Sequence, residues 1–585
     1  MLPLIQIKNL TVDFPGTGSA EPALQDFSLE LNRGEMLAVV GESGSGKSVM
    51  SLSLMKLLSP AARIQQGSIL FSEDGLDAVD LLALSERKFQ DYRGNRLAMI
   101  FQEPMTSLNP VMTCGHQVCE PLMLHQKLNR RQARAEALSL FAKVHLPDPA
   151  LVFQKYPHQL SGGQRQRVMI AMAISCHPML LICDEPTTAL DVRVQKTILD
   201  LLKDLRQSEK MGMIFITHDL GLVVDMADRA LVMLRGREVE SGRVSELFAD
   251  PKHPYTQGLL NCRPALHPKG ERLPVVADFL NEAMKPRKEI PLTPEPKMPR
   301  SLKGGLVALE NKIISPAENP ILVKVRGLHV RFALGKNWLG RPGPGVDALR
   351  DIDFDVYRGE TLGIVGESGS GKTTLGRALL GLTKPAGGSI VYGDTEMLTM
   401  RKSDLLAFRR NIQIVFQDPY SSLNPRLMVG PAIAEPIRVH SRKSRWERKE
   451  QALNLLRLVD LEPAHFNRYP HAFSGGQRQR IVIARALALN PGFVVFDESV
   501  SALDVSVQAQ VLNLINDLKE NLGFTAVFIS HDLSVIRYLC NRVLVMEKGR
   551  IVESGEVENV YLNPQTAYTR SLIAAIPGGQ LLRKE

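Results

Sequence analysis

The sequence predicts an α/β fold that occurs twice along the chain. The same motifs recur in the same order in both halves, and each copy of GESGSGK follows an apolar, strand-like stretch and precedes a helical pattern. Corresponding residues are 325 positions apart at Lys47 and Lys372, 315 apart at Gln102 and Gln417, and 313 apart from Ser161 and Ser474 onward. The halves are therefore copies, and the first half has extra residues between its first two motifs.

The length and composition indicate a folded, multidomain protein. At about 150 residues per domain, the 585 residues suggest several folding units. Hydrophobic residues make up 44% of the chain and charged ones 23%, which is close to the globular average and argues against disorder. The most apolar charge-free run, 168–183, is interrupted by His177 and Pro178 and is shorter than the roughly 20 residues that span a bilayer. We therefore expect no membrane crossing.

The start of the chain and the cysteines indicate a cytoplasmic location. MLPLIQIKNL lacks a basic leader region and is more typical of a first strand than of a secretory signal. Six cysteines in so long a chain show no paired framework, which fits a reducing compartment. We expect the protein to stay in the cytoplasm.

A change of composition separates the two copies. Five prolines lie within PRKEIPLTPEPKMPR, and no apolar periodicity is sustained from about Leu266 to Pro320. Proline-rich chain is extended, at roughly 3.1 Å per residue, and can act as a spacer. The sequence therefore predicts a first domain at 1–265, a linker at 266–320 and a second domain at 321–585.

The motifs GESGSGKS and GESGSGKT match the P-loop pattern G-x-x-x-x-G-K-[ST] in its strand-to-helix setting. Its glycines let backbone N–H groups turn toward phosphates at a helix N-terminus, whose dipole favours anions. We predict that Lys47 and Lys372 reach the β- and γ-phosphates, and that Ser48 and Thr373 hold Mg²⁺. The predicted nucleotide-binding residues of the loops are Gly41, Ser43, Gly44, Gly46, Lys47 and Ser48, and Gly366, Ser368, Gly369, Gly371, Lys372 and Thr373.

Two adjacent carboxylates end an apolar run in each half, in MLLICDE and FVVFDE. In a nucleotide site, Asp184 and Asp497 would support Mg²⁺, while Glu185 and Glu498 would polarise the attacking water. Phosphoryl transfer is mostly positioning and charge stabilisation, so the placement of these groups matters most.

A histidine follows each of these aspartates by 34 residues, again at a predicted strand end. A lone histidine there would normally be structural. The repeated spacing favours a contact of His218 and His531 with the γ-phosphate, where they could also orient the glutamate and water.

The P-loop, a glutamine loop, LSGGQ, the Asp-Glu pair and the histidine, in this order, resemble an ATP-binding-cassette (ABC) ATPase. The resemblance covers nearly the whole chain. It implies two tandem P-loop NTPase cassettes, each with a RecA-like α/β core, a small antiparallel β subdomain and a helical subdomain. It also implies that Gln102 and Gln417 contact Mg²⁺, water and a transport subunit, and that Phe14 and Phe332 stack on adenine.

The resemblance explains why SGGQRQR occurs at 161–167 and again at 474–480. In the family, this signature binds the γ-phosphate of ATP held by the opposite cassette. Ser474, Gly475 and Gly476 would thus close the site built on Lys47, and Ser161, Gly162 and Gly163 the site built on Lys372. Both motif sets are complete, so we predict two hydrolytic sites. The departures are small: FSGGQ replaces LSGGQ in the second half, and Ser499 stands where the first half has Pro186.

Several stretches, such as SLNP after each glutamine loop and HPYTQGLL at His253, resemble the fused two-ATPase subunit of glutathione and oligopeptide importers. The resemblance implies ATP and Mg²⁺ as ligands, two transmembrane permeases and an extracytoplasmic binding protein as partners, no nucleic acid, and a peripheral position on the cytoplasmic face of the inner membrane. In the second half, Thr566 and Ala567 replace His-Pro, which puts the docking of that tail in doubt. Only Cys262 lies near the position of a family cysteine cluster, so we expect no iron-sulfur centre.

Two alternatives stay open at this point. A ribosome-associated translation factor with two cassettes would also be fused and basic, although such proteins usually join their cassettes by a charged helical arm rather than a proline-rich segment. The cargo is also open, because glutathione, peptides, opines and metal complexes all fit an importer ATPase.

Overall fold

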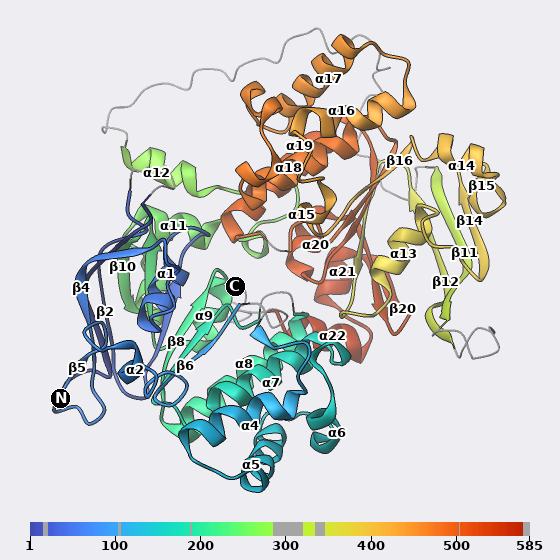
Figure 1. Cartoon of the computed structure of the whole chain (residues 1–585). Coiled ribbons are helices and arrows are strands. Elements are labelled where there is room, and N and C mark those ends of the chain that lie inside the picture. Colours follow the sequence, from blue (N-terminus) through green and yellow to red (C-terminus); the bar gives the residue numbers. More distant parts are fainter. Residues whose placement is uncertain are drawn as a thin grey trace.

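The computed structural model describes residues 1–15, 21–102, 107–187, 190–284, 320–333, 345–501 and 503–576. Within these residues the chain forms two halves of the same construction, coloured blue to green and yellow to red in Figure 1. Each half contains one six-stranded and one four-stranded sheet. The predicted duplication of an α/β fold is confirmed.

The six-stranded sheets form the centre of each half. Their strand orders are β10-β9-β3-β8-β7-β6 and β20-β19-β13-β18-β17-β16, and only the pairs β10/β9 and β20/β19 are antiparallel. The strands are β3 (Met36–Val40), β6 (Leu97–Ile100), β7 (Leu180–Asp184), β8 (Gly212–Thr217), β9 (Arg229–Leu234), β10 (Arg237–Arg243), β13 (Thr361–Val365), β16 (Ile412–Val415), β17 (Phe493–Asp497), β18 (Thr525–Ile529), β19 (Arg542–Glu547) and β20 (Arg550–Glu556). Strands such as β3 and β7 are buried along their whole length, as expected for parallel strands covered on both faces.

The four-stranded sheets are antiparallel, in the orders β2-β1-β4-β5 and β12-β11-β14-β15. Their strands are β1 (Ile5–Asp13), β2 (Leu24–Leu31), β4 (Arg63–Phe71), β5 (Val79–Asp80), β11 (Ile321–Ala333), β12 (Gly345–Tyr357), β14 (Gly387–Tyr392) and β15 (Thr395–Glu396). Burial alternates along β2, so this sheet turns one face to the core. These sheets are the small β subdomains that the family resemblance implied.

Helices cover the sheets and form a helical part in each half between β6 and β7 and between β16 and β17 (Figure 1). The helices of the first half are α1 (Lys47–Leu54), α2 (Glu86–Phe89), α4 (Cys114–His125), α5 (Arg130–Lys143), α6 (Pro149–Gln154), α7 (Gly162–Ile174), α8 (Val192–Glu209), α9 (Leu220–Met226), α10 (Val244–Ala249), α11 (Pro254–Asn261) and α12 (Val276–Met284). Those of the second half are α13 (Lys372–Leu379), α14 (Lys402–Phe408), α15 (Pro419–Ser422), α16 (Val429–His440), α17 (Arg445–Leu458), α18 (Gly475–Leu487), α19 (Val505–Leu522), α20 (Leu533–Leu539), α21 (Val557–Leu562) and α22 (Ala567–Ala574).

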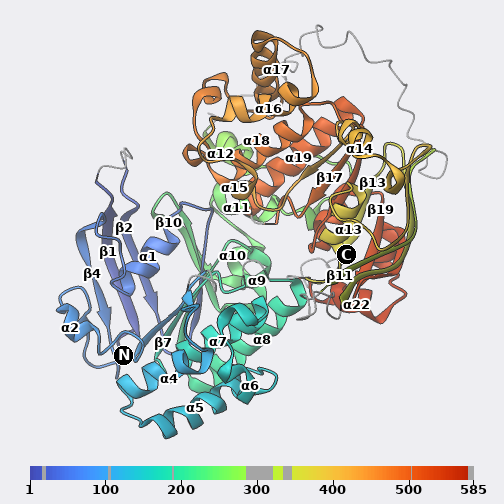
Figure 2. The ribbon, with the colours of Figure 1, turned by 45° about the vertical axis from the view of Figure 1, so that its right-hand side comes forward.

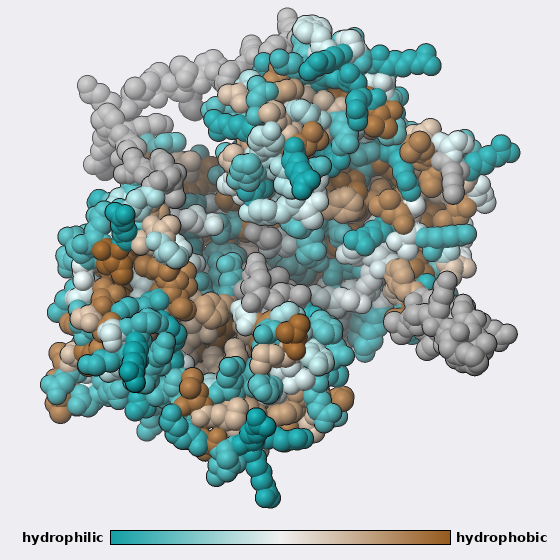
Figure 3. All heavy atoms as spheres, in the orientation of Figure 1, coloured by the Kyte–Doolittle hydropathy of each residue, from teal (hydrophilic) through white to brown (hydrophobic). Residues whose placement is uncertain are grey.

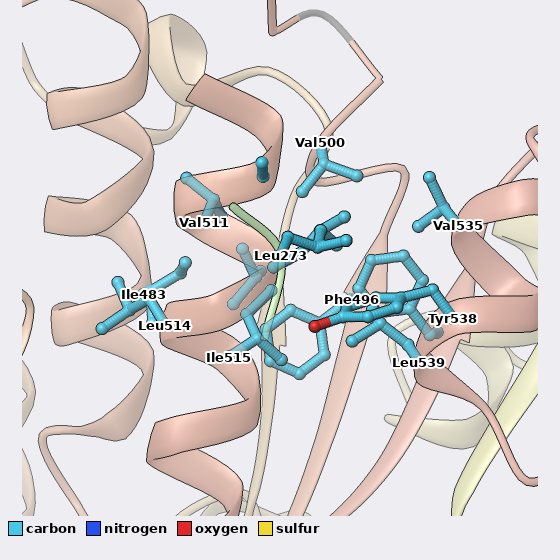
Figure 4. Packing of buried hydrophobic residues seen from close by; sticks show 14 of the residues in the cluster. Leu273, Ile483, Phe496, Val500, Val511, Leu514, Ile515, Val535, Tyr538 and Leu539 are labelled. Carbon is cyan, nitrogen blue, oxygen red and sulfur yellow. The ribbon is translucent and has the colours of Figure 1, made fainter. Parts of the chain in front are cut away.

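The C-terminal tail of the first half, residues 253–284, lies on the second half. Helix α11 contacts α19, and Figure 2 shows α11, drawn in green, beside the orange helices of the second half. Leu273 is buried among apolar side chains of the second half, beside Ile515 and Tyr538 (Figure 4). The sequence predicts a linker from residue 266, whereas the structure has helix α12 at Val276–Met284 within that range. Residues 285–319 of that predicted linker lie outside the described residues.

Asn513 on α19 fixes this tail by its side-chain amide. Its Oδ1 accepts from the N–H of Leu273 at 3.0 Å, and its Nδ2 donates to the carbonyl of Leu273 at 2.8 Å. Tyr538 also donates its hydroxyl hydrogen to the carbonyl of Glu271, at 2.7 Å. The tail is thus bound to the second half through its backbone.

Replacing Asn513 by alanine is expected to lower the free energy of unfolding by about 1–3 kcal/mol, because both backbone groups of Leu273 lose their buried partner. The shift of the urea midpoint measures this loss. Asp200, which is exposed 313 positions earlier on α8, supplies the control, and Asp200→Ala should change stability by no more than about 0.5 kcal/mol. Equal effects of the two variants would contradict a specific role of Asn513.

The described residues contain no helix that is both long enough and apolar enough to cross a membrane. On the face drawn in Figure 3 the surface is mainly hydrophilic, and hydrophobic residues form scattered small groups.

Candidate active sites

Each P-loop connects a central strand to a helix, β3 to α1 and β13 to α13. The residue before each helix, Gly46 or Gly371, has φ of 103°, a conformation that favours glycine. The first glycine of each loop cannot carry a side chain, because a Cβ on Gly41 would lie 2.4 Å from the carbonyl oxygen of Met233. The loops therefore need their glycines for close backbone packing.

The P-loop lysines are buried and bind their own loops. Lys47 donates from Nζ to the carbonyls of Gly41 at 2.7 Å and Glu42 at 2.9 Å. Lys372 makes the same two bonds, to Gly366 at 2.8 Å and Glu367 at 2.9 Å. Burial lowers the pKa of both amines, while nearby carboxylates act in the opposite direction. Phosphate oxygens of a nucleotide would compete with these carbonyls for the same ammonium groups.

The aspartates at the ends of β7 and β17 lie beside the hydroxyl groups of the P-loops. Thr373 donates from Oγ1 to Oδ1 of Asp497 at 3.1 Å, and the hydroxyl of Ser48 lies beside Asp184. Burial raises the pKa of Asp184 to about 6, against the effect of the Ser48 hydroxyl, and burial also raises the pKa of Asp497. A hydroxyl and a carboxylate at this position could bind a hard divalent cation.

The predicted general base of each site is held by the predicted glutamine and histidine. In the first half, Gln102 donates from Nε2 to Oε2 of Glu185 at 3.0 Å, and Nδ1 of His218 lies 3.0 Å from Oε1. Glu185 has φ of 46°, which is uncommon for a residue other than glycine and indicates a constrained backbone. These three predicted site residues thus lie in one cluster, and their roles in hydrolysis stay predictions.

The second half repeats this cluster. Gln417 donates from Nε2 to Oε2 of Glu498 at 2.8 Å, Nδ1 of His531 lies 3.4 Å from the same oxygen, and Glu498 has φ of 47°. Burial would raise the pKa of Glu498, but the bond and charge of His531 outweigh it and lower this pKa. In the first half, the bond and charge of Glu185 outweigh burial and raise the pKa of His218. The interaction with His531 therefore favours the ionised form of Glu498.

The signature serines cap exposed helix N-termini. The hydroxyl oxygen of Ser161 accepts from the N–H of Gln164, and Ser474 does the same with Gln477, at 3.3 Å in both halves. A Cβ on Gly476 would lie 2.2 Å from Val507, so this glycine allows α18 to pack against α19; Gly163 has the same relation to Val194. Among the described residues, neither serine makes a hydrogen bond to the opposite P-loop. Their role in closing the opposite site stays a prediction.

Other residues join the two halves at the P-loops, and the sequence reasoning did not select them. Asp504 accepts from the N–H of Ser43 at 2.9 Å, Ser506 donates its hydroxyl hydrogen to Glu42, and Arg193 forms a 2.6 Å ion pair with Glu367. Arg193 and Ser506 are 313 residues apart, so equivalent positions meet the opposite loops. The repeated sequence ALD before these positions was the available signal.

A cavity of about 160 Å³ lies between the halves at this junction. Its lining includes Glu185 and His218 from the first half and His531 and Asp532 from the second. The structure therefore places residues of both glutamate clusters around one shared space.

The predicted adenine-stacking residues lie at or near the end of the first strand in each half. Phe14 follows β1 and is partly buried, whereas Phe332 on β11 is 47% exposed. An exposed ring face at this position could stack on a base, and the assignment of both residues stays a prediction.

Comparison with known proteins identifies the family. Residues 24–188 and 349–501 match the ABC transporter family, and residues 239–287 match the oligopeptide/dipeptide transporter C-terminal region. The glutathione import ATP-binding protein GsiA of Pectobacterium atrosepticum is 46% identical over 590 residues, which cover 100% of this chain and 92% of that protein. GsiA of Salmonella choleraesuis is 47% identical over 580 residues, covering 98% and 89%.

Solved cassettes are also similar. The dimeric post-hydrolysis state of the ATP-binding cassette MJ0796, bound to ADP and Pi, is 30% identical and covers 40% of this chain and 99% of its own, with a TM-score of 0.37. The family matches fall on both halves and include both P-loops and both Asp-Glu pairs. The chain thus belongs to the ABC transporter family, as an ATP-hydrolysing protein with two ATP-binding cassettes.

Proposed function

We propose that this protein is the energy-coupling ATPase of a membrane importer for glutathione or peptides. It works with two transmembrane permeases and an extracytoplasmic binding protein, at the cytoplasmic face of the inner membrane. Relatives that match over nearly the whole chain are glutathione import ATP-binding proteins, and the first tail matches an oligopeptide/dipeptide transporter region. These similarities support the importer over the ribosome-associated alternative.

The geometry that carries the hydrolytic part of the proposal is the cluster of glutamate, glutamine and histidine, present in both halves. The ionised carboxylate of Glu185 or Glu498 accepts a hydrogen bond from the attacking water and orients it toward the γ-phosphate. The glutamine and histidine hold that carboxylate in place. Because phosphoryl transfer depends mostly on positioning and charge stabilisation, the presence of the same three residue types in both clusters supports two active sites.

The hydroxyl and carboxylate pairs of the two sites, Ser48 with Asp184 and Thr373 with Asp497, fit Mg²⁺. The side-chain oxygens of Gln102 and Gln417 would complete the protein ligands. Bound Mg²⁺ would neutralise charge on the phosphate oxygens. The lysines would then exchange their loop carbonyls for phosphate oxygens.

Closure of the two cassettes couples this chemistry to transport in our proposal. The signature N-termini at Ser161 and Ser474 are exposed and carry N–H groups that can bind a γ-phosphate across the interface. ATP that binds the closed pair more tightly than the open one shifts the population toward closure, and hydrolysis reverses the shift. The contacts of Asp504 and Arg193 with the opposite P-loops support pairing within one chain.

Purification of the tagged chain from gently solubilised membranes tests the importer proposal. We expect two multi-spanning permeases to co-purify in stoichiometric amounts, and cells that lack the chain to lose uptake of labelled glutathione or a labelled peptide. The variant Glu185→Gln/Glu498→Gln should assemble with the same permeases without restoring uptake. Recovery of ribosomal subunits, or of no membrane protein, would overturn the proposal.

A further inference from the structure

The C-terminal tails of the two cassettes cap their helices in the same way but with different residues. In the first tail, His253 caps α11 by accepting from the N–H of Tyr255 at 3.1 Å; in the second, Thr566 caps α22 by accepting from the N–H of Thr569 at 3.1 Å. The departure from His-Pro at Thr566 therefore leaves the docking of this tail intact, against the doubt that the sequence raised.

A glutamate on the last strand of each sheet holds each tail. Glu240 accepts from the backbone N–H groups of Lys252 at 2.7 Å and His253 at 3.1 Å. Glu553, 313 positions later, accepts from those of Gln565 at 2.8 Å and Thr566 at 3.1 Å. These bonds fix the start of α11 and of α22 relative to the sheet that carries the P-loop.

Each tail then delivers one tyrosine hydroxyl to the P-loop of its own cassette. The hydroxyl oxygen of Tyr255 accepts from the N–H of Glu42 at 2.9 Å, and that of Tyr568 accepts from the N–H of Glu367 at 3.0 Å. Tyr255 is fully buried, and burial raises the pKa of Tyr568 to about 12, so its hydroxyl is neutral at physiological pH.

The contacted P-loop residue also binds the lysine and the opposite cassette. The carbonyls of Glu42 and Glu367 accept from Lys47 and Lys372, and their carboxylates meet Ser506 and Arg193 of the other half. One residue thus connects the tail, the phosphate-binding lysine and the interface. Holding its N–H fixes the plane of the peptide that it shares with the preceding glycine, Gly41 or Gly366, whose carbonyl oxygen also accepts from the lysine.

We infer that Tyr255 and Tyr568 are positioning residues for ATP, which hold the second P-loop residue in the phosphate-binding shape through its backbone N–H. They do not touch the nucleotide. Each tail thereby stabilises the ATP site of its own cassette. This role does not depend on which cargo the importer carries.

The isosteric changes Tyr255→Phe and Tyr568→Phe test this role, because each removes only the hydroxyl. The P-loop holds the phosphates both before and during the reaction. A looser P-loop should therefore weaken the binding of the ground state and of the transition state equally. We expect the KM for ATP of the purified chain, and the Kd for ATP by calorimetry, to rise roughly threefold to tenfold for each variant, with kcat within about twofold.

Tyr392→Phe is the matched control, since Tyr392 packs against Phe408 and Phe493 in the region of the antiparallel sheet. It should leave KM and Kd unchanged. An unchanged Kd for ATP in both tail variants would overturn the inference, and so would a loss of thermal stability with unaltered affinity. Both measurements use the chain without permeases, so they give the same answer whether or not the importer proposal holds.

Discussion

Replacing both Glu185 and Glu498 by glutamine is expected to lower ATP turnover by at least about 100-fold while ATP still binds. Glutamine has nearly the same shape and can occupy the same backbone conformation, but its amide oxygen is a poor acceptor of a proton from water. ATP should therefore stay bound and hold the cassettes closed. Turnover measured by phosphate release, and bound ATP measured after rapid gel filtration, test the two parts of this expectation.

The chain offers a close control for this substitution at Glu209. This carboxylate also pairs with a histidine, since Nδ1 of His177 lies 2.9 Å from its Oε2, and it binds Lys143, but it lies at the end of α8 away from both P-loops. Glu209→Gln should keep full turnover. Persistent turnover in the double variant would remove Glu185 and Glu498 from the role of base.

The single variants report whether the two sites are equivalent. The Glu-Gln bonds are 3.0 and 2.8 Å, and the two glutamates have φ of 46° and 47°. Because each glutamate is bound by one glutamine and lies beside one histidine, Glu185→Gln and Glu498→Gln should reduce turnover by similar factors. A large effect of only one of them would show that a single site supplies most of the hydrolysis.

The parts of the fold and site that could be predicted depend on local sequence. A P-loop is specified by glycines within a few residues of its lysine, and the buried strands that end at Asp184 and Asp497 appear as continuous apolar runs. The sequence predicts Gln102, Glu185 and His218 as residues of one ATP site, Gln102 by the family resemblance and the other two by motif and spacing. The structure brings these side chains and their counterparts together in both halves.

The contacts between distant segments could not be predicted. The bond from Glu42 to the hydroxyl of Tyr255 joins residues 213 positions apart, and that from Leu273 to Asn513 joins residues 240 apart. Neither segment carries a pattern that selects its partner, because the bonds use backbone groups that every residue has. The sequence predicts linker for 266–284 because no apolar periodicity is sustained from Leu266 onward, yet this stretch contributes the buried Leu273 and Val276 to the core.

Changing a P-loop lysine together with a signature glycine is expected to show that the signature of each cassette closes the ATP site of the opposite cassette. Gly162 and Gly475 are suitable positions, because an added Cβ would lie 3.5 and 3.9 Å from its nearest neighbours, which is ordinary contact. Aspartate there is favourable for the helix N-terminus, by about 0.3–1 kcal/mol. Against a γ-phosphate about 4 Å away, the same charge costs on the order of 4 kcal/mol. The substitution should therefore spare the fold and prevent closure of one site.

The variants are built on Glu185→Gln/Glu498→Gln, and ATP trapped per chain is counted after gel filtration. If Gly475 closes the site of Lys47, adding Lys47→Ala and Gly475→Asp disables one site only, so one ATP should stay trapped. Lys47→Ala with Gly162→Asp disables both sites, so none should. The opposite result would mean that each signature serves its own cassette. Because the two combinations share the same lysine change and the same kind of glycine change, only the pairing of the sites can make them differ.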